Sequence, residues 1–93
     1  MRQAVWKFPL TPGHPQQTIR VPMGTKLLSA HAQGEEICIW AEVDPDESRC
    51  DFRVLEVYAT GEHFTYDESR KFLGTALLLN GRLVFHVFYL DRK

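Results

Sequence analysis

The fold of this chain is decided by residues 75–89, which read TALLLNGRLVFHVFY. Asn80-Gly81 is the strongest short signal for a β-hairpin, because a two-residue type I′ turn needs positive φ at both centres and these residues reach it most easily. With Leu79 facing Arg82, the predicted pairs of the ladder are Leu78 with Leu83, Leu77 with Val84, Ala76 with Phe85 and Thr75 with His86.

Both faces of this hairpin are apolar. Alternation places Leu78, Leu83, Ala76, Phe85 and Val87 on one face, and Leu77, Val84, Leu73 and Phe88 on the other. Antiparallel hairpins usually leave one face to water, so here each face needs a cover, either from the rest of the chain or from a second copy. We therefore expect a homo-oligomer.

The remaining segments also alternate between apolar and polar residues, as half-buried strands do. The expected strands are residues 4–10, 17–22, 26–33, 37–43 and 52–59. Pro9 lacks an amide hydrogen and favours a sheet edge, and the mixed middle of residues 52–59 also suits a strand near an edge. Together with the hairpin, about seven strands predict one all-β domain over residues 1–93, either a small antiparallel β-sandwich or an open barrel.

Charge and composition exclude several classes of protein. Eleven Lys and Arg residues against 12 Asp and Glu residues give a net charge of -1, which argues against non-specific binding of nucleic acid. No run approaches the ~20 apolar residues that a membrane helix needs, and Met1-Arg2-Gln3 leads into a strand rather than a signal peptide. We expect a cytoplasmic protein in which Cys38 and Cys50 are free thiols, although a disulfide between them is the alternative.

No catalytic or metal-binding pattern stands out. The four histidines have no pair at a spacing that would place two metal ligands on one local element. His86 is expected to be a structural imidazole, hydrogen-bonded to Thr75 or to the backbone. We therefore predict a non-enzymatic protein with no cofactor.

Aromatic side chains beside polar ones are the best candidates for a binding site. Trp40 shares a strand face with Glu42, while Phe64 and Tyr66 lie in the longest predicted loop. With the acidic loop residues Asp46 and Glu47 they could contact a protein partner, so the first hypothesis is an inhibitor of another protein.

A second hypothesis is that the protein sequesters a nucleotide. In a pocket between subunits, Trp40 or Tyr58 would stack on the base, and Arg20 or Arg53, expected at outward strand positions, would pair with phosphate. A third hypothesis is a structural component of a virion.

Several segments in order and spacing resemble a family of small uncharacterised proteins of tailed phages and prophages. They are WKFPL at residues 6–10, IRVPMG at 19–24, LLS at 27–29, IWAEVD at 39–44, TG at 60–61, FLGT at 72–75 and LVFHVF at 83–88. The resemblance implies a phage-borne accessory protein in the cytoplasm of an infected bacterium. Such proteins often counter host defences by capping a defence protein or sequestering a nucleotide signal.

Overall fold

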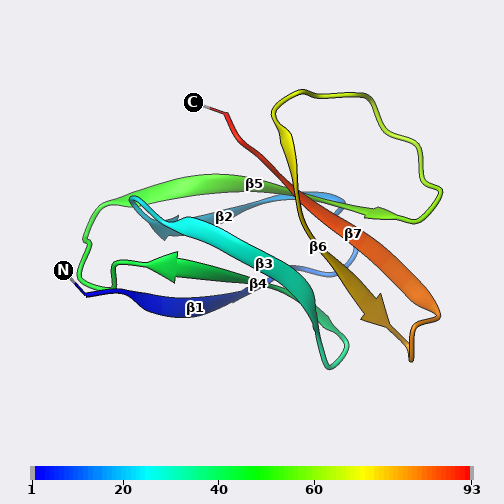
Figure 1. The fold of residues 1–93 in the computed structure, drawn as a ribbon, viewed down its shortest axis with the longest axis horizontal. Helices are drawn as coiled ribbons and strands as arrows, with labels where there is room; N and C mark the ends of the chain where they lie inside the picture. The colour runs from blue at the N-terminus through cyan, green and yellow to red at the C-terminus, as the bar shows by residue number, and fades with distance from the viewer. Residues whose placement is uncertain (1, 93) are drawn as a thin grey trace.

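The computed structural model describes residues 2–92, which form seven β-strands and no helix (Figure 1). The strands are β1 Ala4–Pro9, β2 Gln16–Pro22, β3 Lys26–Gln33, β4 Glu36–Val43, β5 Cys50–Ala59, β6 Arg70–Leu78 and β7 Leu83–Leu90. They lie in two antiparallel sheets, one ordered β1-β4-β3 and the other β2-β5-β7-β6. The predicted all-β fold is confirmed, and its sheets are not closed into a barrel.

The hydrophobic core lies between the two sheets. Its buried members are Leu10, Ala30, Ile39, Leu55 and Val87. Because side chains alternate across a strand, each of these residues has neighbours that point to the outside of the molecule. The two outer faces are therefore formed by the other half of each strand.

The register of the C-terminal hairpin is as predicted, from Thr75 opposite His86 to Leu78 opposite Leu83. Asn80 and Gly81 have positive φ angles of 56° and 83°. The prediction was wrong at one pair: Leu79 itself has φ 51°, so the strand ends at Leu78 and Arg82 meets Leu79 only through a turn hydrogen bond of 3.1 Å.

The prediction for Leu73 was also wrong. The ladder between β6 and β7 shifts register between Phe72 and Gly74, as it does at a β-bulge. This extra residue reverses the alternation, so Leu73 packs against the core while Phe72 pairs with Phe88 on the outer face. One extra residue in β6 thus places Leu73 on the core side of the sheet and Phe72 on its outer face.

The strand order agrees with both expectations about sheet edges. β1 is an edge strand and ends at Pro9, as predicted. β5 lies near an edge, between the edge strand β2 and the interior strand β7. Its polar middle residue, Glu56, is buried there because other side chains compensate its charge, as described below.

Candidate functional site

The loop between β5 and β6 folds back over the outer face of the larger sheet. The ring of Phe64 in this loop stacks on Tyr58 of β5, with centroids 4.1 Å apart. The ring centroid of Phe88 in β7 lies 5.9 Å from that of Phe64 and 5.7 Å from that of Phe72 in β6. These four rings, Tyr58, Phe64, Phe72 and Phe88, are called the aromatic cluster.

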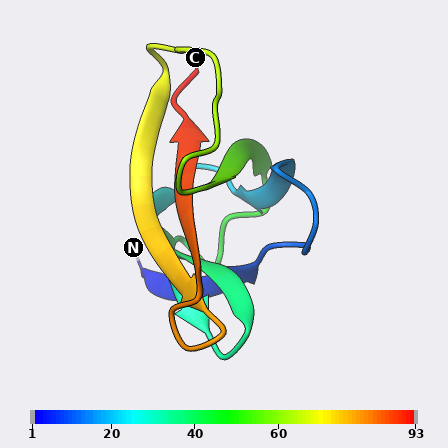
Figure 2. The same ribbon diagram turned by 90° about the vertical axis from the view of Figure 1, so that its right-hand side faces the viewer.

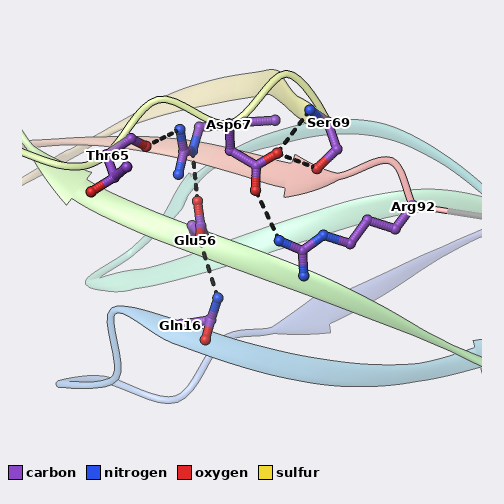
Figure 3. A network of polar contacts seen from close by, with 7 residues as sticks. Gln16, Glu56, Thr65, Asp67, Ser69 and Arg92 are labelled. Carbon is purple, nitrogen blue, oxygen red and sulfur yellow. Dashed lines mark hydrogen bonds and ion pairs between the residues drawn. The ribbon is translucent and has the colours of Figure 1, made fainter.

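A buried ion pair between Arg70 and Glu56 lies beside the aromatic cluster. Figure 3 shows Glu56 with Gln16 and Thr65 in the surrounding network of polar contacts. The Nε of Arg70 donates to the Oε1 of Glu56 at 2.7 Å, and the amide of Gln16 donates to the other carboxylate oxygen at 3.1 Å. The Arg70 side chain is 10% exposed and that of Glu56 7%. Arg70 also donates to the carbonyl oxygen of Thr65 at 2.9 Å, so one guanidinium fastens the loop to the sheet.

Arg70 also contacts the aromatic cluster directly. Its guanidinium carbon lies 4.8 Å from the ring centroid of Phe64 and 5.8 Å from that of Tyr58, within the range of cation–π attraction. Burial, and then the nearby charge of Glu56, raise the pKa of the Tyr58 phenol. Tyr58 is therefore a neutral packing group, with Phe64 stacked on its ring.

Asp67 fixes the end of the same loop. It accepts hydrogen bonds from the hydroxyl and the amide of Ser69, at 2.7 and 2.9 Å, and from Arg92 at 2.8 Å. These donors, the Ser69 hydroxyl first, lower the pKa of Asp67 to about 2. The loop is thus fastened to both β5 and the end of the chain.

Large apolar side chains remain exposed on this outer face. Phe72 is 60% exposed and Leu77 57%, and Phe64 is exposed above the cluster. We call Phe64, Phe72 and Leu77 the β6 patch. Tyr66, another candidate from the sequence, is exposed in the same loop as Phe64. The structure therefore brings Tyr58, Phe64 and Tyr66 to the larger sheet and its covering loop.

Trp40 and Glu42 lie on the opposite outer face. Both alternate with the buried Ile39 and Ala41 of β4, so they point away from the core on the smaller sheet. The indole of Trp40 stacks on the imidazole of His31, with centroids 4.1 Å apart. Trp40 therefore does not join Phe64 and Tyr66 in one surface.

Asp46 and Glu47 lie in the loop before β5, at the other end of the molecule from the β5–β6 loop (Figure 1). Asp46 pairs with Arg2 at 2.6 Å, and Glu47 pairs with Arg49 at 2.7 Å. At ~3.3 Å per residue, the strand between Cys50 and Tyr58 spans roughly 26 Å. The acidic loop is thus separate from the aromatic cluster.

The two candidate arginines lie on different faces of the larger sheet. Arg20 faces outward, paired with Phe52, as predicted. The outward placement of Arg53 was wrong: it pairs with Ile19, which packs against the core, and it donates to the carbonyl oxygen of Thr25 at 2.6 Å. The Arg53 side chain thus stabilises the turn between β2 and β3.

His86 is hydrogen-bonded within the fold, and the two cysteines are not joined in a disulfide. His86 contacts the hydroxyl of Thr75 at 3.3 Å, as predicted, and that of Thr60 at 2.7 Å. Cys38 and Cys50 are free, and burial raises the pKa of the Cys38 thiol. Within residues 2–92 no group of three or more His, Cys, Asp or Glu side chains could hold a metal ion, and no helix could span a membrane.

Sequence reasoning missed a cleft at one end of the sandwich. Figure 2 looks onto this end, where the β1–β2 loop, the β3–β4 hairpin and the β6–β7 hairpin meet. The cleft has a volume of about 390 Å³, and none of the candidate residues from the sequence lines it. Its lining comes from four stretches of the chain, within residues 10–17, 35–37, 57–62 and 78–85, and only the fold brings them together.

A comparison with family models matches residues 1–93 to a domain of unknown function, DUF7352. The chain belongs to the DUF7352 family. Neither a curated protein nor a solved structure gives a significant match to it. The expected relation to uncharacterised proteins is therefore confirmed, and the family assigns a role to none of the candidate site residues.

Proposed function

We propose that this protein acts without catalysis, by binding another protein through the β6 patch. The observation that carries this proposal is the exposure of Phe72 and Leu77 on the same outer face as Phe64. The partners of Phe72 and Leu77 on β7, Phe88 and Val84, are roughly 13 Å apart along the strand, so the patch extends along one outer face. Exposed aromatic and aliphatic side chains on one face are typical of protein-binding surfaces. The buried Arg70–Glu56 pair supports the proposal, because it holds the loop that carries Phe64 in place.

The setting of this binding is also part of the proposal. The resemblance to phage and prophage proteins favours action in the cytoplasm of an infected bacterium. There the partner would be a host protein, and occupying a defence protein would benefit the phage.

A second copy of the chain is the other candidate for the β6 patch. The outer side of the C-terminal hairpin carries Leu77 and Val84, so one hairpin could cover that of another protomer. The nucleotide-sequestering alternative has less support, because Arg53 is occupied by Thr25 and Asp51. The rings of Trp40 and Tyr58, either of which would stack on the base, are already stacked on His31 and Phe64.

The test is a native mass spectrum of the tagged protein purified gently from a bacterial host, compared with a Phe72→Ser/Leu77→Ser variant. Val5→Ser is the matched control, because Val5 is 58% exposed on the outer face of the smaller sheet. We expect a complex with a host protein or a second copy for wild type and Val5→Ser, and a monomer for the double variant. A complex that survives in the double variant would contradict the proposal, and excess mass of a few hundred daltons lost in Trp40→Ala would instead support nucleotide binding.

A further inference from the structure

The cleft of about 390 Å³ has the size and walls of a small-molecule site. Its apolar walls are formed by Leu10, Ile37, Val57, Leu78, Leu83 and Phe85. These residues come from both sheets and include the core residues Leu10, Ile37 and Val57, so the cleft is an opening of the core at the end of the sandwich. A ligand that enters would exchange water contacts for apolar ones.

Two carboxylates line the same cleft. Glu35, from the β3–β4 hairpin, accepts a hydrogen bond from the amide of Leu79 at 3.2 Å. Glu62, after β5, accepts one from the amide of Ala59 at 2.9 Å. Each carboxylate is exposed and uses one oxygen in these bonds, and its second oxygen accepts no hydrogen bond from the described residues. Among the described residues that line the cleft there is no lysine or arginine, so its fixed side-chain charge is negative.

The wall formed by the β1–β2 loop is held in place by one side chain. The amide group of Gln17 donates to the carbonyl oxygens of Thr11 and His14, both at 3.1 Å, and its oxygen accepts from the amide of Thr11 at 2.8 Å. The end of the loop is fixed by a 2.8 Å bond from the amide of Val57 to the carbonyl oxygen of Pro15. The cleft is therefore preformed, which lowers the entropic cost of binding.

We infer that this cleft binds a small organic ammonium ion, with an aliphatic body against the apolar walls and its charged amino group beside Glu35 and Glu62. An organic acid of the same shape would be repelled by the two carboxylates, and a neutral alcohol would lack the charge-assisted hydrogen bonds. This site is separate from the β6 patch and does not depend on the proposed function.

Amide NMR titrations with n-hexylammonium, hexan-1-ol and hexanoate at constant pH and ionic strength test this inference. For a ligand of this size we expect saturable shifts at Ile37, Val57 and Leu83 with a Kd of about 1 mM for hexylammonium. Hexan-1-ol should bind about tenfold more weakly or worse, and hexanoate should cause no saturable shift. Equal binding of the alcohol and the ammonium ion, or no binding of the ammonium ion, would overturn the inference.

Variants show whether binding occurs in this cleft. Glu35→Gln and Glu62→Gln each keep an acceptor oxygen for the backbone amide, so the fold should persist while the Kd rises about tenfold. Glu42→Gln, which removes a carboxylate on the outer face of the smaller sheet, should leave the Kd unchanged. Leu83→Trp should block the cleft and abolish the shifts. Unchanged affinity in both cleft glutamine variants would overturn the role of the carboxylates.

Discussion

Gly74 lies where β6 of the larger sheet closely approaches β3 of the smaller one. A Cβ on Gly74 would overlap the carbonyl oxygen of Ala30 and crowd its carbonyl carbon and amide nitrogen, and all three are backbone atoms that cannot rotate away. Because Gly74 has no side chain, β6 of one sheet can pack directly on β3 of the other. The absence of a side chain is thus a packing requirement at this position.

We predict that Gly74→Ala lowers the free energy of unfolding by about 3 kcal/mol or more, because the sheets must separate to admit the methyl group. Urea unfolding measures the loss. Gly34→Ala is the control, since Gly34 has φ 62° with open space around its Cβ position, and it should cost only about 1–2 kcal/mol from backbone strain. A loss for Gly74→Ala no larger than that of the control would refute the packing argument.

Asp67 makes the free energy of unfolding depend on pH in the acid range. Its pKa is lowered from an ordinary value of 3.8 to about 2 in the folded protein. A lowered carboxyl pKa stabilises the fold fully above the unfolded value, and this stabilisation is lost as the pH falls from about 4 towards 2. We predict that Asp67→Asn is less stable than wild type at pH 7, and that the difference disappears near pH 2.

Urea unfolding of both proteins at pH 7, 4 and 2.5 checks this prediction. Ser69→Ala should raise the pKa of Asp67 towards its ordinary value, because the Ser69 hydroxyl is the largest cause of the shift. Glu68→Gln, at a neighbouring carboxylate, serves as the control and should show the pH dependence of wild type. A constant stability difference between Asp67→Asn and wild type at all three pH values would disprove the linkage.

At the scale of elements, β5 and its following loop depend on each other. Glu56 lies in the middle of β5, Arg70 is the first residue of β6, and the guanidinium reaches back to Thr65 in the loop between them. The loop in turn lays Phe64 over Tyr58. Two strands and ten loop residues are thus joined around one buried charge pair.

We predict that Arg70→Met destabilises the protein by about 3–5 kcal/mol, because it leaves the carboxylate of Glu56 buried without a cation. The double variant Glu56→Gln/Arg70→Met should recover much of this loss, since no charge remains buried. Thermal and urea unfolding provide the measurement, and hydrogen exchange should show the loop opening in the single variant. If the single and double variants are equally stable, the buried charge is not the cause.

At the scale of the whole molecule, the candidate residues divide among separate surfaces. One outer face carries the aromatic cluster and the β6 patch, and the other carries the stacked Trp40 and His31. The acidic loop with Asp46 lies at one end, and the cleft with Glu35 lies at the end with the two hairpins. A single contact surface joining Trp40, Phe64 and Asp46 is therefore not formed within one protomer.

The strands and the register of the hairpin follow from local patterns in the sequence. Alternation of apolar and polar residues is a local property of each strand, and Asn80-Gly81 places the turn through the φ preferences of two adjacent residues, although Leu79 also takes a positive φ. The contact of Thr75 with His86 follows directly from that register. These features depend on residues close in the chain or paired by one turn.

The order of the strands in the two sheets and the surfaces they form depend on tertiary contacts. The bulge at Leu73, the inward Arg53 and the pairing of Glu56 with Arg70 all result from contacts across strands that the local pattern does not encode. The cleft near Glu35 is lined by loops and hairpins distant in sequence. Their positions depend on how two twisted sheets pack around a shared core, which is a property of the whole chain.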